Sequence, residues 1–148
     1  MSLERKARAY IAAVEGGASG DDLAAFYHPD AVQHEFPNRL VPHGAQRDLN
    51  AILQGAERGM KLMERQIYDI HTVTELGDRI VLEYTWTGYP REPVGTVRAG
   101  EAMRARTVLI AAGVTLAPFT LVALVRLVGF GRAVPLALLA KPSDVDHG

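Results

Sequence analysis

Two side chains near the start of the sequence could carry acid–base chemistry if they share an apolar cavity. Tyr10 lies on the apolar side of a segment with helical periodicity, and Glu35 lies in a short alternating segment that is typical of a strand. A carboxylate desolvated in such a cavity holds its proton more tightly and can serve as a general base. A phenol there can donate a hydrogen bond to an oxygen that gains negative charge. The residues alone leave two ordinary alternatives open, a core tyrosine and a solvated surface glutamate.

Other catalytic and metal sites find no support in the sequence. The chain has no cysteine, which excludes disulfides, thiol catalysis and cysteine-ligated metals. The histidines show no metal-site spacing such as H-x-x-x-H, and His28 and Asp30 flank a proline and predict a turn. No glycine-rich phosphate loop and no serine nucleophile elbow occurs. We therefore expect neither a metal nor a cofactor.

The composition predicts one globular domain without a basic surface. The chain has 148 residues, which is a common size for a single domain. Its 16 Lys and Arg residues are balanced by 17 Asp and Glu residues, and the net charge of -1 argues against a nucleic-acid partner. The N-terminal segment mixes basic and acidic residues without an apolar stretch behind them, so it does not read as a signal peptide. We predict a cytoplasmic location.

The N-terminal half predicts three helices and one strand. Ser2 can cap the first helix, which Gly16 and Gly17 end. Its apolar face consists of Leu3, Ala7, Tyr10, Ile11 and Val14. The further elements are expected as a short helix over Asp21–Tyr27, a strand over Ala31–Phe36 and a helix over Ala45–Arg58.

The following segments predict three strands, over Leu62–Val73, Arg79–Thr87 and Glu101–Ile110. In the second of these, alternation places large side chains on one face, which we expect to line a concave apolar interior: Ile80, Leu82, Tyr84 and Trp86. Helices followed by a run of strands indicate an α+β fold, with the helices packed on one face of an antiparallel sheet.

The segment from Thr107 to Ala140 differs from the rest of the chain. Its only charged residues are Arg126 and Arg132, and the hydropathy of its first half reaches the range of transmembrane segments. We weigh three explanations. Residues 107–111 and 115–125 could form the last two strands, although Pro118 argues against a central strand. The segment could be a membrane-associated helix, which we do not favour. A shift of reading frame near residue 106 could also have replaced the natural ending.

Several short motifs follow one another in a familiar order and spacing. In chain order they are Ala9-Tyr10-Ile11-Ala12, Phe26–Val32, Glu35–Asn38, Gly77-Asp78-Arg79 and Ala99–Ala105. Together they cover roughly residues 6 to 106 and resemble the SnoaL-like proteins. These belong to the nuclear transport factor 2-like superfamily, which includes polyketide cyclases, ketosteroid isomerase and limonene epoxide hydrolase.

The resemblance implies a fold and a partner. The family fold is a curved antiparallel sheet wrapped into a cone of cystatin-like architecture, with three helices on the N-terminal side enclosing a pocket for a small hydrophobic molecule. It also implies a homodimer formed through the outer face of the sheet. We place the SnoaL-like domain at residues 3–112 and an atypical apolar tail at residues 113–148.

The resemblance also implies roles for individual residues. In ketosteroid isomerases a tyrosine of the first helix donates to the oxyanion, a carboxylate at the end of the first strand moves the proton, and a later acid shares the oxyanion. By position, Tyr10 matches the donor and Glu35 the base, whereas the stretch Met103–Thr107 lacks the acid. The expected pocket residues are Phe26, His34, Tyr84, Trp86 and Met103, although His34 and Glu35 lie on opposite faces of a regular strand.

These observations predict a protein that binds a small hydrophobic carbonyl compound. It could act on this compound as an isomerase or cyclase by proton abstraction, or in a hydrolase-like manner, without a cofactor. The alternative is a non-catalytic ligand-binding or dimerisation module of the same fold.

Overall fold

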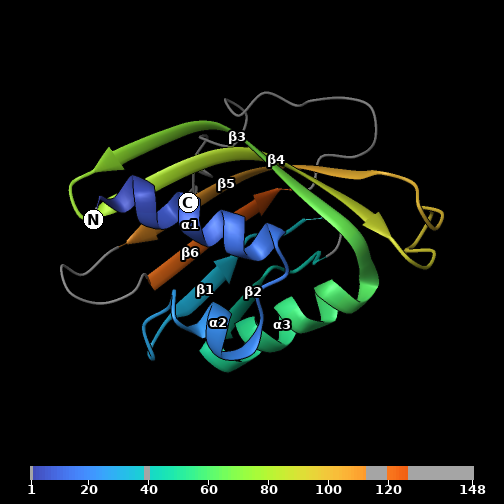
Figure 1. Cartoon of the computed structure of the whole chain (residues 1–148), viewed down its shortest axis with the longest axis horizontal. Coiled ribbons are helices and arrows are strands. Elements are labelled where there is room, and N and C mark those ends of the chain that lie inside the picture. The colour runs from blue at the N-terminus through green and yellow to red at the C-terminus, as the bar shows by residue number, and fades with distance from the viewer. Residues whose placement is uncertain (1, 39–40, 113–119, 127–148) are drawn as a thin grey trace, which may run out of the picture.

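The computed structural model describes residues 2–38, 41–112 and 120–126. In this part of the chain, helices lie beneath an arched antiparallel sheet (Figure 1). Helix α1 spans Leu3–Glu15 and begins as predicted, because the Ser2 hydroxyl accepts a hydrogen bond from the backbone N–H of Arg5 at 3.2 Å. Helix α1 ends at Gly16.

The second and third helices differ from the prediction at their ends. Helix α2 spans only Gly20–Ala24, because the chain leaves it through a tight turn that contains Phe26. Helix α3 spans Leu49–Leu62 and begins four residues later than predicted. The Asp48 carboxylate caps it by accepting a hydrogen bond from the N–H of Ala51 at 2.8 Å.

The residues before this cap form a strand in place of the first helical turn. Strand β2 spans Ala45–Asp48 and pairs antiparallel with β1, Val32–Glu35. Glu35 lies opposite Ala45, and Val32 lies opposite Asp48. Their pairing positions Glu35 and the residues that contact it.

The long strands form an antiparallel sheet in the order β3-β4-β5-β6. Their bounds are Met63–Leu76 for β3, Arg79–Pro90 for β4, Met103–Ala112 for β5 and Thr120–Arg126 for β6. The three predicted strands are confirmed, and each ends two or three residues later than the alternation indicated. Gly77 has a φ of 63° in the turn between β3 and β4, a conformation that favours glycine.

The core lies between α1 and the concave face of the sheet. Ile80, Leu82 and Tyr84 of β4 are buried, which confirms the face predicted from the alternation. Ala7 and Ile11 of α1 are buried in the same cluster. The helix–sheet arrangement confirms the α+β fold class.

The start of the apolar C-terminal segment continues the sheet. Strand β5 runs to Ala112, and β6 pairs with it so that Thr107 lies opposite Val125. A strand pair is what the first of the three explanations expects for these residues. No helix in the described ranges is long and apolar enough to cross a membrane. Pro118 and residues 127–148 lie outside the described residues, so the other parts of the explanations stay predictions.

Candidate functional site

The side chain of Tyr10 meets that of Tyr27. The two hydroxyl oxygens are 2.7 Å apart and share a hydrogen bond. Their rings are nearly perpendicular, with centroids 5.7 Å apart and an interplanar angle of 88°. Phe26 contacts the same Tyr10 ring edge-on at 5.8 Å. Three aromatic rings from α1 and from the turn after α2 therefore form one cluster.

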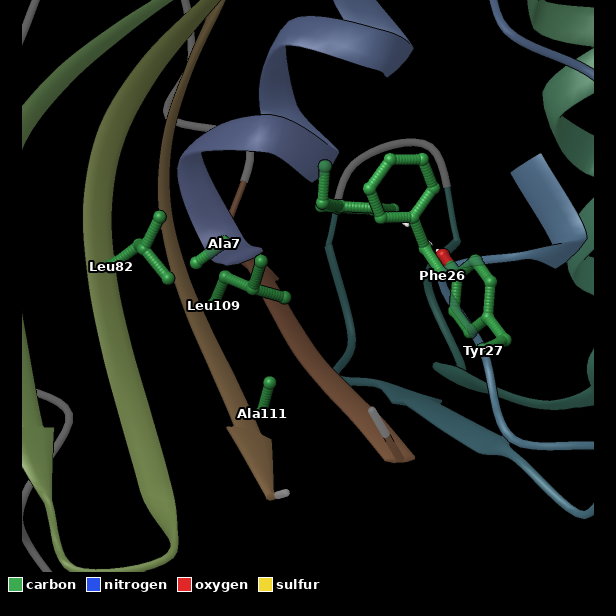
Figure 2. Close-up of a pocket in the computed structure, with 7 residues that line it drawn as sticks. Ala7, Phe26, Tyr27, Leu82, Leu109 and Ala111 are labelled. Carbon is green, nitrogen blue, oxygen red and sulfur yellow. Dashed lines mark hydrogen bonds between the residues drawn. The ribbon is translucent and has the colours of Figure 1, made fainter. Parts of the chain in front are cut away.

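This cluster forms one wall of a small cavity. Figure 2 shows Phe26 and Tyr27 on one side, with Leu82 and Leu109 of the sheet on the other. The volume of the cavity is about 10 Å³, which is room for about one water molecule. Among the described residues, its lining consists of Ala7, Tyr10, Phe26, Tyr27, Leu82, Leu109 and Ala111. The only polar side-chain groups of these seven residues are the two phenol hydroxyls.

The tyrosine hydroxyls at the cavity are neutral donors. Burial raises the pKa of Tyr10 well above its usual value, and the neighbouring Tyr27 raises it further. Burial raises the pKa of Tyr27 to about 12, although its hydrogen bond with Tyr10 acts in the opposite direction. In a pair of phenols, one proton lies between the two oxygens and the other proton is free for a third acceptor. The pair can therefore donate one hydrogen bond to a ligand.

Two further tyrosines lie on the inner face of the sheet. The rings of Tyr68 and Tyr84 are 5.4 Å apart, and burial raises the pKa of both phenols. The side-chain oxygen of Gln66 accepts a hydrogen bond from the Trp86 indole N–H at 2.9 Å and a long one from the Tyr68 hydroxyl at 3.4 Å. Tyr84 and Trp86 thus lie on the predicted face and pack against the core, but neither lines the cavity.

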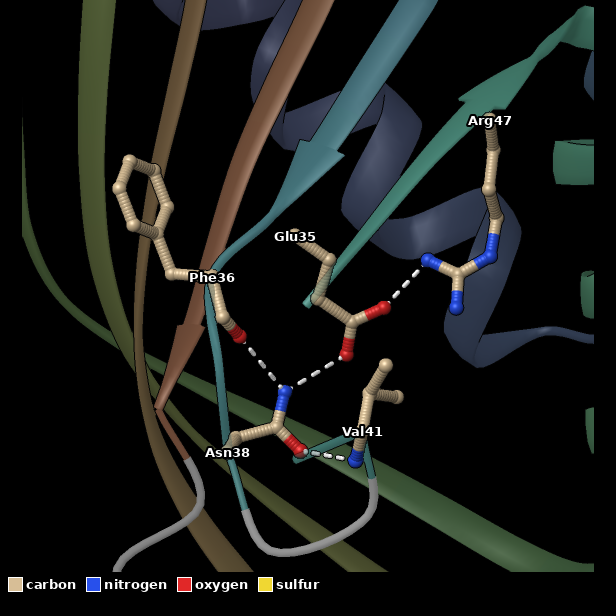
Figure 3. Close-up of polar contacts among 5 residues, drawn as sticks. All are labelled: Glu35, Phe36, Asn38, Val41 and Arg47. Carbon is tan, nitrogen blue, oxygen red and sulfur yellow. Dashed lines mark hydrogen bonds and ion pairs between the residues drawn. The ribbon is translucent and has the colours of Figure 1, made fainter. Parts of the chain in front are cut away.

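Glu35 lies outside the cavity lining and is engaged by polar neighbours (Figure 3). Its carboxylate forms an ion pair with Arg47 of β2. The other carboxylate oxygen accepts a hydrogen bond from the Asn38 amide at 2.9 Å. Asn38 also accepts a hydrogen bond from the backbone N–H of Val41, so the cluster holds the connection between β1 and β2. The structure therefore joins Tyr10 to Tyr27 and joins Glu35 to Arg47.

The remaining predicted pocket residues take three different places. Phe26 lines the cavity. His34 is exposed, because strand alternation turns it away from the side on which Glu35 lies, and it is not among the described lining residues. Met103 is buried, but in a separate cluster with Met63 and Val97.

Sequence reasoning missed the partners of both candidate residues. The sequence predicts Tyr27 only as the last residue of the second helix, and the adjacent aromatic residues Phe26 and Tyr27 were the available signal. The helix predicted over Ala45–Arg58 includes Arg47, so the sequence does not predict its ion pair with Glu35 across two strands. In the described residues no group of three or more His, Asp or Glu side chains could hold a metal ion.

The arched antiparallel sheet over three described helices is the nuclear transport factor 2-like fold. The chain belongs to the SnoaL-like domain family, whose model matches residues 7–112. This confirms the resemblance seen in the sequence motifs. No curated protein sequence matches the chain.

Several solved structures are similar to this one. AclR of Streptomyces galilaeus, a candidate hydroxylase, is 14% identical with a TM-score of 0.69, over 92% of this chain and 90% of that one. IdmH of Streptomyces antibioticus, a candidate polyketide cyclase, is 16% identical with a TM-score of 0.67. The match covers 84% of this chain and 91% of IdmH. A candidate SnoaL-like polyketide cyclase of Shewanella denitrificans is 16% identical with a TM-score of 0.67. The match covers 82% of this chain and 88% of that protein. At these identities the similarity establishes the fold.

Proposed function

We propose that this protein binds a small apolar molecule that carries an oxygen acceptor, in the cavity beside Tyr10 and Tyr27. The observation that carries the proposal is the hydrogen-bonded phenol pair in an otherwise apolar lining. One phenol proton is free to be donated, and a carbonyl oxygen of the ligand would accept it. A buried polar group without a partner is unfavourable, so the pair selects a ligand that completes its hydrogen bonding.

The lining also disfavours a charged ligand. Its described residues contain no ionisable group other than the two phenols, whose raised pKa values keep them neutral at physiological pH. A charge placed there would lose its hydration without gaining a counterion. Two of the similar structures are named as candidate polyketide cyclases. A polyketide carries carbonyl groups on a largely apolar skeleton, which fits the same chemistry.

A ligand larger than a water molecule requires movement of the lining. Phe26 is only half-buried and lies at the edge of the aromatic cluster, so rotation of its ring is the least costly way to enlarge the cavity. Leu82 and Leu109 are fully enclosed in the core and are expected to stay in place. Binding is therefore expected to change the environment of Phe26.

Catalysis by proton abstraction is the second candidate. Glu35 would be the base and Tyr10 the donor to the enolate oxygen. Both carboxylate oxygens of Glu35 are engaged, however, so abstraction requires release of the ion pair with Arg47. Because Glu35 is engaged in this way, we prefer ligand binding to catalysis as the proposed function. A ligand-binding module without catalytic activity is the simplest protein of this kind.

The binding proposal is tested with 1-indanone and indane, which differ only by a carbonyl group. Isothermal titration calorimetry of the full chain is expected to give saturable binding of 1-indanone, with indane roughly threefold to tenfold weaker because one hydrogen bond is lost. Tyr10→Phe and Tyr27→Phe should each reduce this preference, and Tyr89→Phe outside the cavity should leave it unchanged. Equal affinities for the two compounds would overturn the proposal.

Proton abstraction has its own readout in the same compound. The α-protons of 1-indanone exchange in heavy water only when a base removes them, and nuclear magnetic resonance follows the exchange. A rate above that of buffer that disappears in Glu35→Gln would support the catalytic candidate. A rate equal to that of buffer would leave the protein as a binding module.

The partner and location remain predictions. Homodimerisation, the absence of a nucleic-acid partner and the cytoplasmic location rest on the sequence and on the family resemblance. Light scattering of the purified chain would measure the first of these directly.

A further inference from the structure

A second cleft lies at the end of α1 that is remote from the cavity. It forms where the C-terminal ends of α1 and α3 meet the start of β3, and its volume is about 400 Å³. Small-molecule sites commonly have volumes of this order. Glu15 at this end lies about 12 Å along the helix axis from Ala7, which lines the cavity. The described residues that line the cleft differ from those that line the cavity.

Among the described residues, four charged side chains line this cleft, two of each sign. They are Arg65, Arg91, Glu15 and Glu64. In the described part of the chain, none of these four forms an ion pair with another side chain. Four exposed charges of opposite sign therefore face one cleft without direct ion pairs between them.

Two of the four charged side chains, Glu15 and Arg65, make contacts with other residues. A carboxylate oxygen of Glu15 accepts a hydrogen bond from the backbone N–H of Tyr68 at 2.9 Å. The guanidinium carbon of Arg65 lies 4.4 Å from the centroid of the Tyr89 ring, a cation–π distance. Within the described ranges, the side chains of Arg91 and Glu64 make no hydrogen bond or ion pair.

We propose that this cleft binds a small zwitterion with an ammonium and a carboxylate group, of the free amino-acid type. An anion alone would gain the arginines but meet repulsion from Glu15 and Glu64, and a cation alone would meet the converse. A molecule with both charges satisfies both sets, through charge-assisted hydrogen bonds.

The cleft also offers an apolar surface for a side chain. Met60 and the buried Met63 contribute thioether side chains, and thioethers adapt to irregular shapes. Gly17 has a φ of 84°, and a Cβ built there would lie 3.4 Å from the Met60 sulfur. Glycine at this position keeps the turn after α1 close to α3. A compact aliphatic side chain such as that of leucine fits this surface.

The single tryptophan of the chain can report on occupancy. Gln66 lines the cleft and accepts the hydrogen bond of the Trp86 indole N–H. Trp86 also packs against the cluster that contains Met63. A ligand that contacts Gln66 or Met63 is therefore expected to change the fluorescence of Trp86.

The experiment titrates the full chain with L-leucine and follows Trp86 fluorescence. We expect a saturable change. N-acetyl-L-leucine lacks the cation and L-leucinamide lacks the anion. Each should therefore bind at least about tenfold more weakly than L-leucine. Arg91→Gln should weaken L-leucine binding by a similar factor, because it removes the guanidinium group that makes no ion pair within the described residues and is available to the ligand carboxylate. The exposed Arg98, in the same loop but outside the cleft, provides the matched control Arg98→Gln, which should bind as the unmodified chain does.

Three outcomes would overturn the proposal. One is the absence of a saturable change with L-leucine in both fluorescence and calorimetry. Another is an affinity for N-acetyl-L-leucine or L-leucinamide equal to that for L-leucine, which would assign the cleft to a singly charged ligand. The last is competition between L-leucine and 1-indanone, which would place both in the apolar cavity. Failure of 1-indanone to bind would leave this inference unaffected.

Discussion

The hydroxyl groups of Tyr10 and Tyr27 share a hydrogen bond of 2.7 Å that joins α1 to the turn after α2. This bond makes a testable contribution to stability. Tyr10→Phe or Tyr27→Phe leaves the other buried hydroxyl without its partner, and each should lower the free energy of unfolding by about 1 kcal/mol. The double variant leaves no unpartnered hydroxyl, so its loss should be smaller than the sum of the two single losses. Urea unfolding measures all three, and additive losses would show that the bond carries no coupling energy.

Stability should fall in alkaline solution because of the buried phenols. Burial raises the pKa of Tyr27 from 10.0 to about 12, and those of Tyr10, Tyr68 and Tyr84 are raised as well. Below pH 10 both the native and the unfolded protein keep these protons. Between pH 10 and about 12 the unfolded chain loses the proton that native Tyr27 retains, so the free energy of unfolding falls by on the order of 1 kcal/mol per pH unit for each such tyrosine.

Tyrosinate absorbance provides the measurement for this pH dependence. The native protein should ionise its tyrosines at higher pH than the same protein in urea. Tyr27→Phe should remove part of the difference between the two curves and make stability less sensitive to pH in this window. Native and denatured titration curves that coincide would contradict the burial of the phenols.

The ion pair between Glu35 and Arg47 is expected to be structural. The two side chains are 12% and 25% exposed, so removal of one charge leaves the other poorly solvated. Glu35→Gln or Arg47→Gln should therefore lower the free energy of unfolding by about 1–2 kcal/mol, and the double variant should lose less than the sum.

A solvent-exposed ion pair provides the control. Glu57 and Lys61 of α3 are 57% and 75% exposed, and Glu57→Gln should change stability by less than about 0.5 kcal/mol. If Glu35→Gln has an equally small effect, Glu35 is not held by Arg47 in solution. Chemical denaturation provides the comparison.

The absence of a side chain at Gly88 is expected to position Trp86. A Cβ built at Gly88 would lie closer than 3.0 Å to the Trp86 indole ring and 3.1 Å from the Met63 sulfur. Gly88→Ala must displace the ring and should destabilise the fold by about 1–3 kcal/mol. The emission of Trp86 should shift because the hydrogen bond to Gln66 is disturbed.

Gly59 offers a matched control for this substitution. A Cβ built there meets nothing within 4 Å, and the residue lies inside helix α3. Gly59→Ala should therefore stabilise the protein by about 0.5–1 kcal/mol, because alanine favours the helix. An unchanged emission spectrum in Gly88→Ala would show that the indole ring does not lie over this residue.

Local patterns in the sequence determined much of the fold. Helix α1 begins after Ser2 and ends at Gly16, as predicted, because capping depends on residues within one turn of the helix end. The buried face of β4 followed from alternation alone, since side chains of a strand point to opposite sides in turn. The order of helices and strands indicated the fold class, because helices followed by a run of strands are typical of an α+β fold.

Only the tertiary structure decided which side chains meet. Residues 45–48 form a strand because β1 lies beside them to accept their backbone hydrogen bonds, and no pattern within those residues reports the neighbour. Tyr10 bonds Tyr27 while Glu35 bonds Arg47, although the sequence suggested a common cavity for Tyr10 and Glu35. Periodicity assigns each residue to a face of its own element. The packing of elements against one another determines which faces meet and how much space remains between them.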